Sequence, residues 1–138
     1  MAKDYQVILI SHNKLADGVL AAIKMIAGDQ IDAQAYGLMP GQNPDVKASE
    51  IEATIAPETH TLILADLFGG SMANAAARLS TMPNVRLITG LNLALALQAV
   101  LEHPWTDEEI QKSIARAQEN IKEVQLDLSD QDSEADFF

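Results

Sequence analysis

Short apolar runs alternate with helix-patterned segments along most of this chain. The clearest run, Val7–Ile10, has four consecutive aliphatic residues, which is typical of a strand buried on both faces. Three further runs predict strands at 31–38, 61–65 and 85–89. The other segments show helical spacing or a helix-start signal, at 15–27, 43–56, 71–79, 93–101 and from 106 onward. Alternation in 124–128 predicts a last strand with one wetter face.

Capping signals mark the start of three of these helices. Asn43 stands before Pro44, the order expected of an N-cap residue and the first helical position. Thr106 and Glu109 have the spacing of a capping box. Ser71 follows two glycines and is predicted to cap the helix at 71–79.

The order of strands and helices predicts an α/β fold with one doubly wound, mainly parallel sheet covered on both faces. Four or five strands in 138 residues favour the strand order 2-1-3-4 over a six-stranded dinucleotide-binding fold. The first and third strands are then neighbours, and ligands bind beyond their carboxyl ends. We expect one domain over residues 1–128 and a solvated acidic tail over 129–138.

Composition excludes several classes of protein. Aromatic residues make up only 4% of the chain, which argues against stacking on flavin or single-stranded nucleic acid. The net charge of −11 argues against binding to nucleic acid or to an anionic membrane surface. The chain has no Cys, so disulfides and a thiol nucleophile are excluded. No apolar run is long enough to span a bilayer, and a cytoplasmic location is expected.

The predicted crevice receives a histidine from one strand end and a carboxylate from the other. His12 follows the first strand and is the candidate nucleophile; Asp66 follows the third and would orient it. Taken singly, each has a plainer interpretation, as a strand-end His bonded to a local carbonyl and as a turn-forming Asp. Asp17 is the competing partner, although a place on the exposed face of the first helix suits it better.

Gly69, Gly70 and Ser71 form the predicted anion-binding half of the site. Consecutive glycines let backbone N–H groups approach a ligand, and the helix that follows adds its positive end. The plainer interpretation is a capping Ser after a flexible turn. The chain has neither a P-loop nor a dinucleotide fingerprint, and His60 and His103 are too dispersed to build a metal site with His12.

Two sequence stretches resemble a known family. Residues 8–18, Ile-Leu-Ile-Ser-His-Asn-Lys-Leu-Ala-Asp-Gly, and 66–74, Asp-Leu-Phe-Gly-Gly-Ser-Met-Ala-Asn, are similar to the mannose-type IIA component of the bacterial sugar phosphotransferase system. The similarity covers most of residues 5–128. It implies that His12 accepts phosphate through Nε2 from the phosphocarrier HPr, while Asp66 holds Nδ1 and Gly69, Gly70 and Ser71 receive the phosphoryl oxygens.

The same resemblance implies partners and an assembly. Phosphate would pass to a IIB component, which serves sugar uptake through IIC and IID, and these partners would bring the chain to the membrane periphery. A homodimer would exchange the carboxyl-terminal strand between subunits. We expect Leu67, Phe68 and Met72 to form an apolar docking rim. Asn13 and Met72 depart from the family pattern, where Gly and Pro are common.

Four other functions are compatible with parts of this pattern. A receiver-like module would be phosphorylated on Asp66, but it needs an acidic pair where this chain has Ser11 and His12. The phosphodonor subunit of dihydroxyacetone kinase has a related domain. A regulatory phosphohistidine module would use the same site to control an interaction. A flavodoxin-like ligand binder would carry no phosphate.

Overall fold

A computed structural model describes residues 4–127 and shows the predicted parallel sheet. Its strands are β1 (Tyr5–His12), β2 (Ala33–Leu38), β3 (His60–Ala65) and β4 (Val85–Thr89). They are hydrogen-bonded in the order β2-β1-β3-β4, and each neighbouring pair is parallel. The predicted α/β class and strand order are therefore confirmed.

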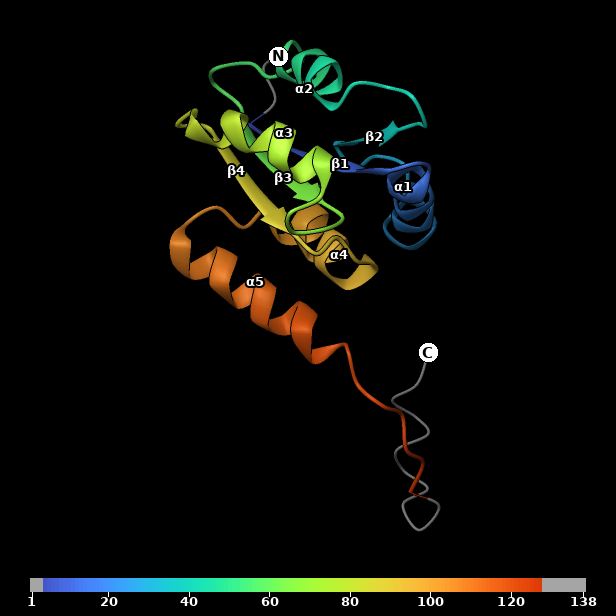
Figure 1. Ribbon diagram of the computed structural model, residues 1–138. Coiled ribbons are helices and arrows are strands. Elements are labelled where there is room, and N and C mark those ends of the chain that lie inside the picture. Colours follow the sequence, from blue (N-terminus) through green and yellow to red (C-terminus); the bar gives the residue numbers. More distant parts are fainter. Residues whose placement is uncertain (1–3, 128–138) are drawn as a thin grey trace.

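Helices cover both faces of the sheet (Figure 1). The helices are α1 (Leu15–Ala27), α2 (Pro44–Glu52), α3 (Ser71–Ala76), α4 (Leu93–Glu102) and α5 (Asp107–Glu119). Figure 1 shows α2 and α3 on one face, and α1 and α4 on the other, with α5 packed against α4. This is the layering that right-handed crossovers between parallel strands require.

The core divides into two apolar clusters, one on each face of the sheet. Successive side chains of β1 point to opposite faces, so Val7 and Leu9 enter one cluster while Ile8 and Ile10 enter the other. All four side chains are completely buried. The aliphatic run that predicted this strand thus fills both clusters.

Helix starts follow the predicted capping residues in two cases. The Asn43 side chain accepts a hydrogen bond from the Asp45 N–H at 2.9 Å. Thr106 and Glu109 form the reciprocal bonds of a capping box at the start of α5. These local interactions need no tertiary contact, which is why the sequence alone reveals them.

The helix predicted over 71–79 is shorter than expected. The α-helical part, α3, ends at Ala76 and passes into a 3-10 helix, η1 (Ala77–Thr81). The hydroxyls of Ser80 and Thr81 donate to the carbonyls of Ala77 and Arg78 at 2.6 and 2.7 Å. These hydroxyls compete with the backbone for the carbonyls of η1, which ends at Thr81.

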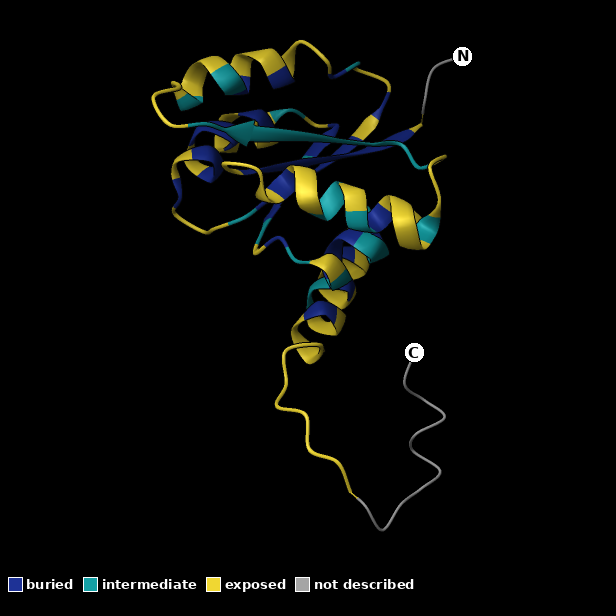
Figure 2. Ribbon diagram, turned by 90° about the vertical axis from the view of Figure 1, so that its right-hand side faces the viewer, coloured by how far each residue is buried: buried dark blue, intermediate teal, exposed yellow. Residues whose placement is uncertain are grey.

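The predicted last strand does not form within this single chain. Residues 121–127 have no regular secondary structure, and Val124 and Leu126 are 72% and 66% exposed. Figure 2 shows this segment leading away from the body of the domain with every residue exposed. Leu128 and the predicted tail lie outside the described residues, so strand exchange stays a prediction. Within residues 4–127, no helix has the length and apolar character needed to cross a membrane.

Candidate functional site

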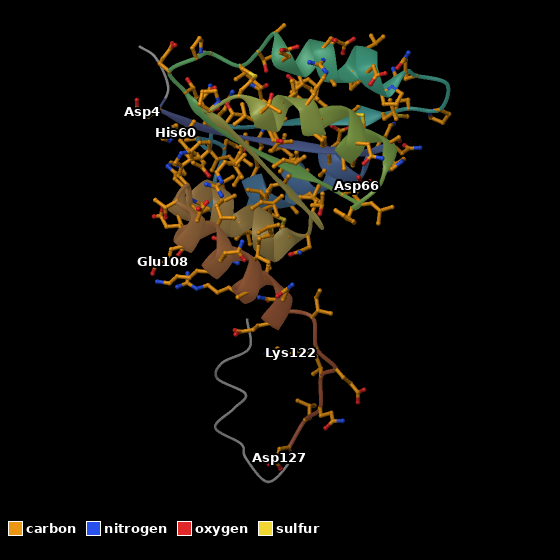
Figure 3. The ribbon with its side chains drawn as sticks, turned by 60° about the vertical axis from the view of Figure 1, so that its left-hand side comes forward. Asp4, His60, Asp66, Glu108, Lys122 and Asp127 are labelled. Carbon is orange, nitrogen blue, oxygen red and sulfur yellow. The ribbon has the colours of Figure 1, made fainter. Side chains whose placement is uncertain are left out.

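The candidate site lies at the carboxyl ends of β1 and β3. His12 is the last residue of β1, and Asp66 comes directly after β3. The register pairs Ile10 with Ala65, which brings the two following loops together. Figure 3 shows Asp66 at this end of the sheet, with Asp4 and His60 at the other. The site therefore occupies the switch point where a doubly wound fold binds its ligands.

One oxygen of Asp66 holds both the main chain and the side chain of His12. Oδ2 accepts the His12 backbone N–H at 2.9 Å and lies 2.9 Å from Nδ1 of the imidazole. The Asp66 side chain is only 10% exposed, whereas the His12 side chain is 49% exposed. A largely buried carboxylate thus fixes the ring orientation, while the imidazole itself stays about half exposed.

The charge on Asp66 determines which ring nitrogen carries the proton. Burial by itself would raise the pKa of this carboxyl, but the hydrogen bonds from the backbone and ring of His12 outweigh burial and lower the pKa. Asp66 is therefore ionised at neutral pH and can only accept hydrogen bonds. In the neutral imidazole of His12, the proton sits on Nδ1 and the lone pair on Nε2.

Ser71 lies beside the second ring nitrogen. Its Oγ is 3.2 Å from Nε2 of His12. The prediction that Ser71 caps the helix is wrong: Gly70 occupies the N-cap position, Ser71 is the first helical residue, and no side chain caps α3. The hydroxyl is not needed at the helix end, so it is available to the imidazole.

The two glycines between Asp66 and Ser71 have different roles. Gly69 has a φ of +80°, a left-handed conformation that favours glycine. Gly70 donates its N–H to the Leu67 carbonyl at 3.0 Å, so this N–H is already engaged. A Cβ at Gly70 would lie 3.2 Å from Cε1 of His12, which shows that the missing side chain makes room for the ring. The Asn74 side chain braces the loop through the Gly69 carbonyl.

The loop after β1 contains positions that the sequence prediction missed. The Ser11 hydroxyl accepts the Ala16 N–H at 2.7 Å and ties the strand end to α1. Asn13 has a φ of +51°, and Asn is among the few residues that tolerate this conformation. Asn can therefore occupy the position at which the resemblance led us to expect Gly.

Gly37 of β2, the neighbouring strand, packs closely against the backbone of the same loop. A Cβ at Gly37 would lie 2.1 Å from the Asn13 carbonyl oxygen, so only glycine fits. The Asn13 N–H donates to the Leu38 carbonyl at 2.7 Å and closes this contact. The sequence did contain a signal for this contact, because Gly37 lies inside a predicted strand and such a glycine often marks a place where another backbone approaches closely.

The predicted docking rim is only partly present. Leu67 and Phe68 are exposed, Phe68 to 87%. Met72 is completely buried in the cluster beneath α3, so its prediction as a surface contact is wrong. Met72 follows Ser71 in sequence, but the turn of the helix carries the next side chain from the site into the core.

The other two histidines take part in packing at the opposite end of the sheet. His60 stacks on Trp105 with ring centroids 4.1 Å apart, and His103 stacks on Tyr5 at 4.4 Å. His103 also ends α4 in a left-handed conformation. In the part of the chain that is described, no three His, Asp or Glu side chains group as metal ligands would.

These features define a class of α/β domain in which a carboxylate-held histidine lies at the topological switch of a parallel sheet. The sequence pattern of the EIIA-man family, described as PTS system fructose IIA component, matches residues 6–118. The chain belongs to this family and is a IIA component of the sugar phosphotransferase system.

Individual relatives agree with this assignment. The chain is 35% identical over 96 residues to the PTS system sorbose-specific EIIA component of Klebsiella pneumoniae, an alignment that covers 67% of this chain and 70% of the relative. It is 24% identical over 123 residues to the PTS system mannose-specific EIIAB component of Escherichia coli K12, covering 84% of this chain but 38% of that longer protein. The mannose/sorbose specific IIA subunit from Enterococcus faecalis superposes with a TM-score of 0.77 at 31% identity, covering 91% and 98% of the two chains.

Proposed function

We propose that His12 carries a phosphoryl group between two protein partners, accepting it from a phosphohistidine of HPr and passing it to a IIB component. The observation that carries this proposal is the contact between Nδ1 of His12 and Oδ2 of Asp66, at 2.9 Å. This contact leaves the lone pair of the neutral ring on Nε2, at the ring edge beside the exposed Ser71. The exchange would take place in the cytoplasm and serve sugar uptake through IIC and IID.

The proposed transfer moves the phosphoryl group from one imidazole nitrogen to another. The Nε2 lone pair forms the new N–P bond, while the donor's N–P bond breaks and its electron pair returns to the donor imidazole. Positive charge grows on the His12 ring during attack, and the Asp66 carboxylate stabilises it. Transfer to the IIB component repeats the step in the other direction, with Nε2 as the leaving group.

Backbone donors next to the imidazole would hold the phosphoryl oxygens. The first helical hydrogen bond of α3 runs from the Asn74 N–H to the Gly70 carbonyl. The three preceding N–H groups, of Ser71, Met72 and Ala73, have no acceptor within the helix. Met72 is completely buried and Ala73 nearly so, whereas Ser71 is exposed beside the ring, so we assign the binding of phosphoryl oxygens to the N–H and hydroxyl of Ser71. Gly70 leaves room for the imidazole because it has no side chain. Gly69 forms the turn that leads into α3.

Partner proteins would dock over the exposed ring edge. Leu67 and Phe68 lie in the loop between Asp66 and Ser71 and project apolar surface beside the site. Burial of these side chains against HPr or IIB would exclude water from the reacting phosphorus. Phosphorylation of Asp66 itself is disfavoured, because Oδ2 already accepts two hydrogen bonds and Oδ1 is buried.

The decisive test replaces the proposed nucleophile. His12→Ala should fold and yet accept no phosphate from phosphorylated HPr, because no other imidazole lies at this end of β1. His60→Ala is the matched control: it removes an imidazole at the far end of the sheet and should retain labelling. Acid-labile, base-stable label is expected on the unaltered chain. Equal labelling of His12→Ala would refute the proposal.

We also propose that the exposed carboxyl-terminal segment pairs with a second copy of the chain. Among residues 4–127, strand β4 has a neighbouring strand on one side only, and Val124 and Leu126 expose large apolar areas. Sedimentation should show a dimer of the full chain and a monomer of Val124→Asp/Leu126→Asp. A monomer at every concentration of the unaltered chain would contradict this proposal.

A further inference from the structure

We propose that the Ser71 hydroxyl masks the lone pair of His12 Nε2 in the resting protein and moves onto a phosphoryl oxygen once the phosphate has arrived. Ser71 would thus be a positioning residue with two successive acceptors. The first half of this inference rests on the geometry of the unphosphorylated site alone. The second half rests on the proposed function.

The direction of the hydrogen bond follows from the groups around the ring. Oδ2 of ionised Asp66 accepts from Nδ1, so in the neutral imidazole the Nε2 atom has a lone pair and no proton. Only Ser71 can then supply the hydrogen for the 3.2 Å contact between Oγ and Nε2. The hydroxyl therefore points at the electron pair that must attack phosphorus.

The mask must be released before transfer. A phosphorus atom in line with Nε2 needs the direction from which the hydroxyl now donates. Ser71 is exposed and its Oγ has no capping bond to keep, so rotation about its Cα–Cβ bond frees the nitrogen at small cost. The backbone of Ser71 stays fixed in the first turn of α3 during this rotation.

The same hydroxyl has a second acceptor after transfer. Once phosphorus is bonded to Nε2, its oxygens lie in the region that Oγ can reach, and a charged oxygen is a stronger acceptor than a neutral imidazole. The serine O–H bond stays intact throughout, and no proton leaves the side chain. The hydrogen bond thus restrains the free imidazole and stabilises the phosphorylated one.

Two variants separate this role from general support of the fold. Ser71→Ala removes the hydroxyl, and Ser71→Thr retains it on the same backbone. The first measurement is the rate at which diethyl pyrocarbonate modifies His12, followed by mass spectrometry of the peptide that contains it. The exposed His60 in the same sample is the internal reference.

We expect His12 in Ser71→Ala to react about fivefold faster than in the unaltered chain, the factor that one hydrogen bond of ordinary strength represents. Ser71→Thr should react as the unaltered chain does, and His60 should react equally in all three. An unchanged or slower reaction of His12 in Ser71→Ala overturns the masking role. This measurement needs no phosphate and stands even if the proposed function fails.

The second measurement follows the phosphorylated state. Each protein is loaded with phosphoramidate, a small phosphoryl donor, and the loss of acid-labile phosphate is timed. Phosphate on Ser71→Ala should be lost about fivefold faster, with Ser71→Thr again close to the unaltered chain. If His12 of Ser71→Ala is modified faster but its phosphate is lost at the unaltered rate, the proposed hydrogen bond from Ser71 to a phosphoryl oxygen is refuted. Failure of the unaltered chain to take up phosphate on His12 counts against the proposed function and leaves the first measurement decisive for masking.

Discussion

Gly37 offers the sharpest test of how the fold positions His12, the proposed nucleophile, because Gly37 itself has no reactive group. It lies on β2, where a Cβ would meet the Asn13 carbonyl oxygen at 2.1 Å. Asn13 follows His12 directly, so any shift of this carbonyl is transmitted to the imidazole. The informative substitution is Gly37→Ala, which adds one methyl group on a different strand from the imidazole of His12.

The size of the displacement follows from the contact. Ordinary contact begins near 3.4 Å, so the two backbones must separate by about 1.3 Å, and neither atom belongs to a side chain that can rotate away. The 2.7 Å hydrogen bond from the Asn13 N–H to the Leu38 carbonyl would lengthen with it. Overpacking of this kind costs about 1–3 kcal/mol. A misplacement of about 1 Å lowers a transfer rate on the order of 100-fold.

The assay combines denaturant unfolding with the initial rate of phosphate uptake by folded protein. Gly18→Ala is the matched control: Gly18 lies within α1, and an added Cβ meets nothing within 4 Å. That variant should gain about 0.5–1 kcal/mol in stability, since Ala favours a helix over Gly, and should transfer at the normal rate.

The reasoning would be refuted by a Gly37→Ala protein with normal stability and a normal rate. A variant that is destabilised but transfers at the normal rate would show that the Asn13 loop relaxes without moving His12. Imidazole NMR signals of His12 report this independently of any partner, because displacement should weaken the contact of Nδ1 with Asp66.

Two further predictions concern residues next to His12. Asp66→Asn should lower the free energy of unfolding at neutral pH by about 1–3 kcal/mol, because a charged acceptor of two hydrogen bonds is lost. The lowered pKa of Asp66 means that its contribution is present above the ordinary carboxyl range near pH 4 and disappears as the pH falls through the folded-state pKa. The free energies of unfolding of the unaltered chain and of Asp66→Asn should therefore converge as the pH falls. A difference between them that grows on acidification would contradict this pH dependence. Asn13→Val should cost about 1–2 kcal/mol more than Asn13→Gly in thermal unfolding, because a β-branched residue is strained at a φ of +51°; equal stabilities would disprove the strain.

Local patterns revealed most of the fold. The run Val7–Ile10 fills both core clusters, and the signals at Asn43 and Thr106 start helices where they were expected. Each of these features is encoded within a few neighbouring residues. The strand order 2-1-3-4 followed from general rules of connection, and it placed the loops after β1 and β3 side by side.

The candidate site was only partly predictable. His12 and Asp66 are in contact, as the switch point implied, but Ser71 is not a cap and Met72 is not at the surface. Both errors arise because the exact start of α3 decides which side chains face the imidazole and which face the core. A shift of one residue along a helix rotates a side chain by about 100°.

The sequence by itself determined the kind of fold, its strand order and the end of the sheet that bears the candidate histidine, because periodicity and capping are local properties and general rules of connection fix the order of the strands. Only the tertiary structure decided how the histidine is held. Asp66 reaches His12 across 54 positions, and Gly37 approaches Asn13 from another strand. Such contacts depend on distances between separate elements, and residue spacing along one element does not encode them.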